Sequence, residues 1–499
     1  MSKLFNQSIK HILAIIIGII SVFSFAPFNF NFIPYLTLIG LFSLWINDNP
    51  KTALLRGWLF GLGLMIPGTL WLRISISQFG GVNPIMASIA TLGFIAIVSL
   101  YFGITGWLGC KLTKHPTLRL SLTFPAAWCI IEWLRGWLLT GFPWLAFGYS
   151  QIDSIIGQGY APIIGVYGIS LIMTLIAGFI VLSINNWNKS FLNSMYYLTC
   201  AALLWIGGLL LTPLQWNMPY QSPFYVSLIQ PSIPQSLKWD PDKRIPTLKT
   251  YTRLTKQAKG TLIVWPETAV PDFLHRVETE WLNPLTQELA TRSTNLIVGA
   301  PVLDADGNTY YNGAVLLGTN FAAYYKRHLV PFGEYLPFKS LLGSVLKFLR
   351  IPMSNFTPGQ FNSHSIRINE HIAGISICYE DAFGEEIRAS LPEASYLVNL
   401  SNDGWFGDSL APHQHLEISR MRALEMARPL VRATNSGISA IIDSRGNIQA
   451  SSQLFIETIV TGLIQPMTGK TWFVIWGDTA TLIIALILIS LATAISNFH

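Results

Sequence analysis

Long apolar runs near both ends of this 499-residue chain constrain its fold more than any other feature. A helix needs roughly 20 mostly apolar residues to cross a bilayer, and such runs lie before residue 215 and after residue 470. Charged side chains avoid them: of the 58 Lys, Arg, Asp and Glu residues, 13 fall in 1–215, 44 in 216–470 and one in 471–499. The sequence therefore predicts a membrane protein with one water-exposed domain inserted between spanning segments.

Eight spans are predicted, seven in a membrane domain of residues 1–215 and one in residues 471–499. The first run is interpreted as an uncleaved anchor, because it ends in Phe25-Ala26-Pro27-Phe28 without the small residues of a signal-peptide cleavage site. The predicted spans cover residues 11–26, 33–47, 54–77, 87–110, 120–139, 163–186, 194–213 and 472–495.

Lys and Arg are distributed unevenly among the short loops. The N-terminal segment and the second, fourth and sixth loops carry nearly all of them, whereas the odd-numbered loops contain only Arg73. Because loops rich in Lys and Arg stay in the cytoplasm, the N-terminus is predicted to be cytoplasmic. Seven crossings then deliver residues 216–470 to the outside, and the eighth returns the C-terminus to the cytoplasm.

The inserted domain is predicted to be a layered α/β domain, because short β-rich runs alternate with helical patterns between residues 223 and 466. The predicted strands are 224–229, 261–265, 295–299, 313–317, 321–326, 371–378, 396–400 and 439–443, and the predicted helices are 277–292, 381–390 and 413–428.

Three of these strands end near a residue that can carry chemistry: Glu267, Lys326 and Cys378. Such side chains gather at the carboxyl ends of strands in α/β folds. A cysteine at a strand-to-helix turn is a candidate nucleophile, the glutamate can take its proton, and the lysine can stabilise a tetrahedral intermediate. Each also has a simpler explanation, because surface Glu and Lys are common and Cys378 can be a buried structural residue.

This triplet resembles the Glu-Lys-Cys triad of the nitrilase, or carbon-nitrogen hydrolase, superfamily, which implies an α-β-β-α sandwich. Nearly the whole chain is similar to the family of bacterial apolipoprotein N-acyltransferases. The similarity is carried by Gln230 to Trp239, Trp265-Pro266-Glu267-Thr268, Lys326 to Glu334, Cys378-Tyr379-Glu380, Ser401 to Phe406, and Glu132 to Trp137 followed by Thr140 to Trp144.

The resemblance implies that Glu267 is the general base, Lys326 the oxyanion stabiliser and Cys378 the nucleophile. Four further residues match positions that the family needs: Trp239, Glu334, Tyr379 and Glu380. From the residues alone, Glu334 and Glu380 either orient Lys326 or the attacking amine, or form structural salt bridges.

The implied reaction moves an acyl chain from a phospholipid, typically phosphatidylethanolamine, to Cys378 as a thioester. The chain then passes to the α-amine of a lipoprotein's N-terminal diacylglyceryl-cysteine. The expected place is the bacterial inner membrane with the catalytic domain in the periplasm. The protein is expected to act as a monomer, without cofactor or metal, and without nucleic-acid partners, since no metal-ligand spacing, phosphate loop or dinucleotide fingerprint is present.

Two other functions remain open at this point. A membrane-tethered amidase or nitrilase of a small amide has the same triad, although a soluble substrate requires neither seven spans nor the apolar segment 335–353, which is either an interfacial helix or a segment packed on the domain. A transporter predicts ionisable residues in several spans, whereas Glu132 and Arg135 form the only clear intramembrane pair. That pair is either a structural ion pair or a contact for a lipid headgroup.

The predicted topology is tested with a reporter that is active only in the periplasm. A fusion after Pro219 is expected to be active, because seven crossings precede it, and a fusion after Lys114 is expected to be inactive. The reverse pattern of activities would contradict the predicted orientation.

Overall fold

The computed structural model describes residues 2–318, 321–335, 355–360 and 364–497. The chain forms two compact units. The helical unit comprises residues 1–70, 88–214 and 475–499, and the layered unit comprises residues 71–87 and 215–474.

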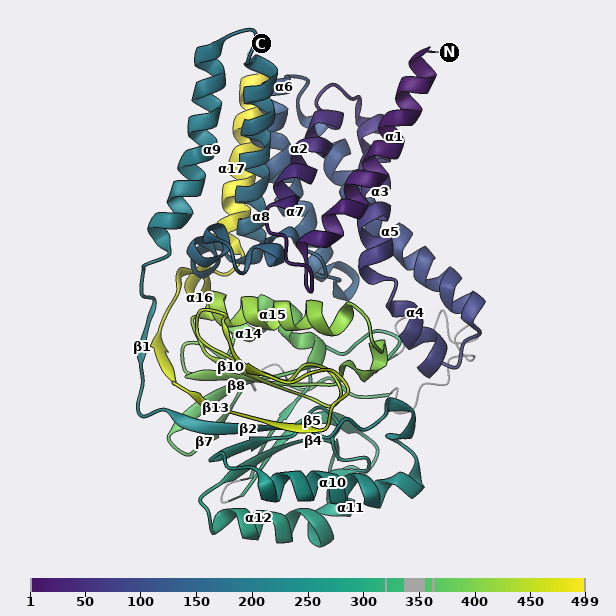
Figure 1. Ribbon diagram of the computed structural model, residues 1–499, viewed down its shortest axis with the longest axis vertical. Helices are drawn as coiled ribbons and strands as arrows, with labels where there is room; N and C mark the ends of the chain where they lie inside the picture. Colours follow the sequence, from purple (N-terminus) through teal and green to yellow (C-terminus); the bar gives the residue numbers. More distant parts are fainter. Residues whose placement is uncertain (1, 319–320, 336–354, 361–363, 498–499) are drawn as a thin grey trace. The chain divides into compact units, whose positions relative to one another are not determined.

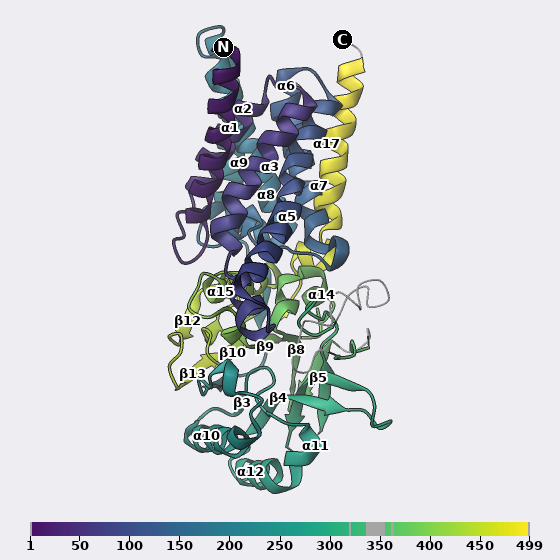
Figure 2. The same cartoon turned by 90° about the vertical axis from the view of Figure 1, so that its right-hand side faces the viewer.

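Helices in the helical unit run nearly side by side (Figures 1 and 2). Among the described residues, five helices are long and apolar enough to cross a membrane, and a sixth is added if a bent pair counts as one span. The described helices therefore do not confirm the predicted eight. The main helices are α1 (Ser2–Ser21), α2 (Ile33–Trp45), α3 (Pro50–Thr69), α5 (Pro84–Leu112), α7 (Phe124–Trp137), α8 (Ile155–Asn186), α9 (Phe191–Leu211) and α17 (Thr479–Asn497).

Three predicted spans depart from a single long helix. Helix α2 has 13 residues and α7 has 14, and at 1.5 Å per residue each is shorter than the bilayer core of roughly 30 Å. A π-helical turn, Arg119–Thr123, directly precedes α7. The predicted span 54–77 is broken, since Pro50–Thr69 and Leu72–Phe79 are bent by 58°.

The intramembrane pair Glu132 and Arg135 is a structural element of the helical unit. Their closest N–O distance is 3.9 Å, but each makes shorter contacts to the loop after α7. Arg135 Nη1 donates to the carbonyls of Phe142 at 2.8 Å and Trp144 at 2.6 Å, and Glu132 Oε1 accepts from the Phe147 backbone N–H at 3.0 Å. These contacts favour the structural interpretation over a headgroup contact.

Two six-stranded mixed sheets form the centre of the layered unit (Figure 1). The first has the order β13-β2-β3-β4-β5-β6 and the second the order β12-β11-β10-β9-β8-β7. Strands β2, β3 and β4 pair in parallel, as do β8, β9 and β10. The first sheet comprises β2 (Phe224–Gln230), β3 (Leu262–Val264), β4 (Asn295–Leu303), β5 (Tyr310–Leu317), β6 (Ala322–Tyr325) and β13 (Thr458–Ile464). The second comprises β7 (Ser365–Ile368), β8 (His371–Ile377), β9 (Tyr396–Ser401), β10 (Leu430–Thr434), β11 (Ala440–Ile442) and β12 (Ile448–Ser451), and β1 (Asn217–Pro219) pairs separately with β14 (Met467–Gly469).

Alternate side chains of the central strands enter two different cores. In β3, Leu262 and Val264 lie in the core between the sheets, whereas Ile263 packs on the outer face with helices α10 (Arg244–Gln257), α11 (Leu274–Val277) and α12 (Asn283–Ala290). Helices α14 (Gly384–Arg388) and α15 (Ala411–Met426) cover the other sheet. The layers are therefore α-β-β-α, which confirms the predicted sandwich, and burial on both faces explains why the strands are continuously apolar.

All eight predicted strands of the domain coincide with strands, but β7, β10, β12, β13 and helix α10 were not predicted. Arg432 in the middle of β10 and Gly462 in β13 interrupt the apolar patterns that identify strands. The predicted helix 277–292 is divided by a π-helical turn, Glu278–Leu282. Apart from Tyr335, the predicted amphipathic segment 335–353 lies outside the described residues.

Residues 71–87 pack within the layered unit on the turn Asp403–Phe406. The ring of Trp71 lies 4.6 Å from that of Phe406, and Phe79 lies 5.2 Å from Trp405. Trp71 Nε1 also donates to Gln414 Oε1 at 3.2 Å. These aromatic contacts give residues 71–79 a packed place in the layered unit, beyond the break that follows α3.

Candidate active site

Strands β3, β6 and β8 place Glu267, Lys326 and Cys378 just beyond their carboxyl ends, as the sequence predicts. All three side chains are buried, with 6%, 1% and 9% of their surface exposed. The chain after β3 passes very close to Gly299, where an added Cβ would lie 2.1 Å from the Pro266 carbonyl oxygen. Glycine at this position therefore lets the Glu267 turn cross the neighbouring strand.

Lys326 lies between two carboxylates. Its Nζ donates to Glu267 Oε1 at 3.2 Å and to Glu334 Oε1 at 2.9 Å, and Asn312 Nδ2 donates to the same two oxygens at 2.8 and 2.9 Å. Burial lowers the pKa of Lys326, but the Glu267 and Glu334 carboxylates outweigh it and raise the pKa above its usual range. The two carboxylates thus favour the charged form of Lys326, and Glu334 is one of the two that hold its ammonium in place.

Cys378 begins a 3₁₀ turn, Cys378–Ala382, directly after β8. Its backbone has a φ of 53°, which L-residues rarely adopt. Its carbonyl oxygen accepts hydrogen bonds from Asn399 Nδ2 and His415 Nε2, both at 3.3 Å. These two donors hold the unusual turn in place.

Burial and two charged neighbours act on the Cys378 thiol. Burial raises the pKa of the thiol and the Glu267 carboxylate raises it further, whereas Lys326 lowers it. The turn after Cys378 has only five residues, too short for a substantial helix dipole. The resting site therefore favours the thiol form of Cys378 over the thiolate.

Glu380 joins the Cys378 turn to the segment that follows Lys326. Its carboxylate accepts from the backbone N–H of Ile377 at 2.7 Å, of Arg327 at 2.7 Å and of His328 at 3.2 Å, and from Tyr324 Oη at 2.9 Å. Among the described residues its hydrogen-bond partners are backbone amides and a hydroxyl, and no salt bridge to its carboxylate is found there. Glu380 fixes the distance between the strand ends that carry Lys326 and Cys378.

Tyr379 and Trp239 are the remaining predicted site residues. Tyr379 lies within the Cys378–Ala382 turn, and its ring packs on those of His328 at 5.6 Å and Phe383 at 4.9 Å. Trp239 is half-buried at the end of the segment Gln230 to Trp239. Among the described residues, no hydrogen bond or ring contact joins Trp239 to the triad.

A second lysine, Lys238, lies at the site and was not predicted. It is 4% exposed, and its Nζ donates to the Glu267 carbonyl at 3.1 Å and to Thr268 Oγ1 at 2.5 Å. Burial lowers the pKa of Lys238 to about 8, although Glu267 and Cys378 act in the opposite direction. Its position directly before Trp239 was the only signal in the sequence.

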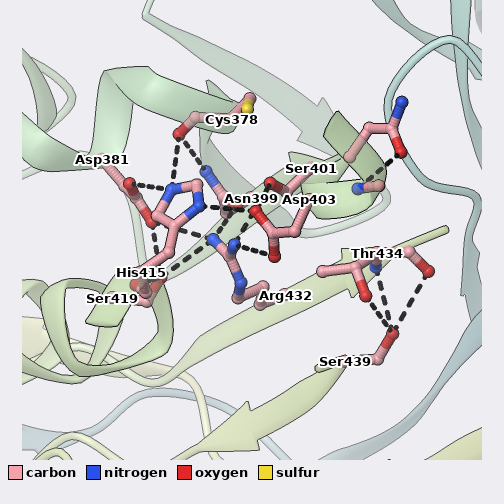
Figure 3. A network of polar contacts seen from close by, with 12 residues as sticks. Cys378, Asp381, Asn399, Ser401, Asp403, His415, Ser419, Arg432, Thr434 and Ser439 are labelled. Atoms are coloured by element: carbon pink, nitrogen blue, oxygen red, sulfur yellow. Dashed lines mark hydrogen bonds and ion pairs between the residues drawn. The ribbon is translucent and has the colours of Figure 1, made fainter. Parts of the chain in front are cut away.

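A buried network of four ionisable groups lies beneath Cys378 (Figure 3). His415 on α15 is within 2.8 Å of Asp403 through Nδ1 and within 2.9 Å of Asp381 through Nε2. Arg432 on β10 donates to the same two carboxylates, at 3.1 Å to Asp381 and 2.9 Å to Asp403. Two cations thus balance two anions in this part of the core.

Both ring nitrogens of His415 face carboxylate oxygens, so both must donate and the ring is an imidazolium. Burial and Arg432 oppose this charge, but Asp381 and Asp403 outweigh them and raise the pKa of His415 to about 9. The network was not predicted, although an arginine between Val431 and Ala433 in an apolar strand is a signal for it.

No group of three or more His, Cys, Asp or Glu side chains suited to a metal ion occurs in the part of the chain that the structure describes.

Two family profiles match the chain. The profile described as carbon-nitrogen hydrolase matches residues 225–472. Among solved structures, the carbon-nitrogen hydrolase from Helicobacter pylori G27 is 19% identical, covers 49% of this chain and 90% of its own, and has a TM-score of 0.38. The profile match identifies residues 225–472 as a carbon-nitrogen hydrolase domain.

The N-terminal profile and the full-length relatives identify a more specific family. The profile described as apolipoprotein N-acyltransferase N-terminal domain matches residues 17–179. Apolipoprotein N-acyltransferase from Methylococcus capsulatus is 42% identical over 94% of this chain and 92% of its own. The enzyme of that name from Nitrosomonas europaea is 38% identical over 99% and 98%. This chain belongs to the apolipoprotein N-acyltransferase family.

The His415 network predicts that stability falls at alkaline pH. A histidine whose pKa rises from about 6.5 in the unfolded chain to about 9 in the fold contributes fully below pH 6.5. The contribution is lost as pH rises to 9, at a slope approaching about 1.4 kcal/mol per pH unit. In detergent, the thermal midpoint of the wild type is expected to approach that of His415→Gln between pH 7 and 9.

His413→Gln is the matched control, because His413 is a half-buried neighbour on the same helix. Its difference from the wild type is expected to stay constant over this range. A constant difference for His415→Gln as well would show that His415 is not charged in the fold.

Proposed function

We propose that this protein transfers an acyl chain from a phospholipid to the α-amine of the N-terminal diacylglyceryl-cysteine of apolipoproteins, through a thioester on Cys378. The observation that carries the proposal is the burial of Glu267, Lys326 and Cys378 beyond three strand ends, in a chain that belongs to this family over nearly its whole length. Phosphatidylethanolamine is the proposed donor.

The first half-reaction forms the thioester. Glu267 takes the proton of the Cys378 thiol, and Sγ attacks the ester carbonyl carbon of the phospholipid. Negative charge develops on the carbonyl oxygen, where the Lys326 ammonium stabilises it. When the tetrahedral intermediate collapses, the C–O bond breaks and the leaving oxygen takes the proton from Glu267, which releases a lysophospholipid.

The second half-reaction uses the same groups in the opposite direction. The neutral α-amine attacks the thioester carbonyl, and the Glu267 carboxylate takes a proton from the attacking nitrogen. Lys326 again stabilises the oxyanion. Collapse breaks the C–S bond, the thiolate recovers its proton from Glu267, and the acceptor leaves as an amide.

The site's geometry supports these roles. The Lys326 ammonium is held by the Glu267 and Glu334 carboxylates, and Asn312 donates to both of these carboxylates, so the lysine is oriented before the oxyanion forms. The raised pKa of Cys378 requires a base, and Glu267 is the carboxylate that most affects that pKa. Burial of all three groups excludes water, which protects a thioester between the two half-reactions.

We also propose the membrane arrangement that the sequence predicts: eight crossings, both termini cytoplasmic, and residues 216–470 as a periplasmic domain of a monomeric inner-membrane enzyme. The uneven distribution of Lys and Arg supports it. Helix α1 begins and α17 ends at the same end of the helical unit in Figures 1 and 2, as an even number of crossings requires.

The alternative, an amidase of a small amide, has less support. It accounts for residues 225–472 but not for the match of residues 17–179 to the N-terminal profile. Both substrates of the acyltransferase are lipids, which gives the spans a purpose.

Replacing Cys378 with Ala or Ser is expected to reduce transfer by more than 10³-fold, since neither side chain replaces a thiolate nucleophile at this site. The assay supplies phospholipid and a diacylglyceryl lipopeptide with a free α-amine, and follows the lipopeptide amide by mass spectrometry. Thermal unfolding checks that both variants fold.

Cys200→Ala is the matched control, because Cys200 is a half-buried cysteine in α9, and it is expected to keep wild-type activity. The N-acetylated lipopeptide should accept nothing. Wild-type transfer by a folded Cys378 variant would exclude Cys378 as the nucleophile.

A further inference from the structure

The geometry points to Lys238 as a positioning residue of this site: it holds the turn that carries Glu267 and supplies a second positive charge near Cys378. This inference rests on the proposed function, because it concerns how that reaction is balanced. Lys238 is buried, and its Nζ donates to the Glu267 carbonyl and to Thr268 Oγ1.

Lys238 binds the backbone of the general base rather than its carboxylate. Thr268, which it also contacts, has a φ of 44° and is buried. Two strong donor contacts on consecutive residues therefore fix a turn that the backbone alone does not favour. The carboxylate of Glu267 remains directed to Lys326 and Asn312.

The segment that carries Lys238 is anchored on the opposite sheet. Ile233 exchanges two hydrogen bonds with the Asn435 side chain, at 2.8 and 3.1 Å. Gln235 Oε1 accepts from Asn402 Nδ2 at 2.8 Å. Lys238 thus reaches Glu267 from a segment held by residues after β9 and β10, so its ammonium is fixed between the strand ends of both sheets.

The charges of the site require a second cation. Glu267 and Glu334 are two anions, and Lys326 is only one cation, so these three groups leave one net negative charge in a buried site. The ammonium of Lys238 brings the sum of these four groups to zero, while the buried Glu380 carboxylate nearby is held separately by backbone N–H groups and Tyr324. Burying an uncompensated charge is costly, and an unbalanced negative charge would oppose thiolate formation at Cys378.

The balance holds through the proposed reaction. When the Cys378 proton moves to Glu267, one anion replaces another and the sum is unchanged. In the tetrahedral intermediate, the oxyanion and Glu334 are the two anions, and Lys326 and Lys238 are the two cations. Without Lys238, every one of these states carries one excess negative charge.

The test measures thiolate formation at Cys378 without any lipid. The full-length protein in detergent is alkylated with iodoacetamide between pH 6 and 10, and the rate at Cys378 is read by peptide mass spectrometry, which separates it from the other three cysteines. Lys238→Met is expected to lower the rate at pH 7 about tenfold, equivalent to about one pH unit, and the difference from the wild type is expected to shrink above pH 8, where the wild-type Lys238 loses its own charge.

Two further variants separate charge from packing. Lys238→Arg keeps the charge and is expected to stay within about threefold of the wild-type rate, whereas Lys238→Gln keeps a donor without charge and is expected to behave as Lys238→Met. Lys243→Met, which removes an exposed lysine from the same stretch of chain, is the control and should leave the profile unchanged.

A wild-type profile for either Lys238→Met or Lys238→Gln would overturn the inference. If Lys238→Met does not fold, the Gln and Arg variants decide the matter. This result would leave the proposed function untouched. The proposed function is contradicted by a different result, full activity of Cys378→Ala, whatever the alkylation profile shows.

Discussion

The catalytic end of the layered unit depends on one buried lysine held between two carboxylates. Lys326 contacts Glu267 and Glu334, and Asn312 bonds to both. A buried ammonium is tolerated only when it is paired and hydrogen-bonded. These contacts therefore hold four parts of the chain together: the turn after β3, strand β5, the end of β6 and the segment leading to Glu334. Cys378 lies close enough for Glu267 and Lys326 to shift its pKa.

The turn Cys378–Ala382 is held by a second, separate set of charged side chains. The network of His415, Asp381, Asp403 and Arg432 is neutral in sum and donates from His415 to the Cys378 carbonyl. Asp403 begins the turn that ends in Trp405 and Phe406, on which residues 71–79 pack. Residues 71–79, which lie between helices α3 and α5 in the sequence, thus pack on the turn that begins at Asp403. Asp403 in turn contacts His415, which donates to the Cys378 carbonyl within the same unit.

The sequence predicted the site residues that follow apolar strands, because an apolar run marks the strand and a polar residue directly after it marks the strand end. Glu267 and Cys378 follow strands whose ends are buried on both faces, and Lys326 follows a strand that is partly buried. Lys238, His415 and Arg432 were missed, since a lysine in an irregular segment and charges inside a helix or strand look like surface residues until their partners are known. The eight-span count rests on hydropathy alone, and short or bent helices such as α2 and α3 limit what hydropathy resolves.

In the proposed reaction an acyl chain rests on Cys378 between the two half-reactions. The intact mass of the protein after incubation with phospholipid alone shows whether this acyl-enzyme forms. The wild type is expected to gain one acyl mass and to release one equivalent of lysophospholipid in a single burst, because the buried site excludes water. Glu267→Gln is expected to gain none, having lost the base. Continuous release of free fatty acid with no acyl mass on the protein would contradict the account and favour a hydrolase.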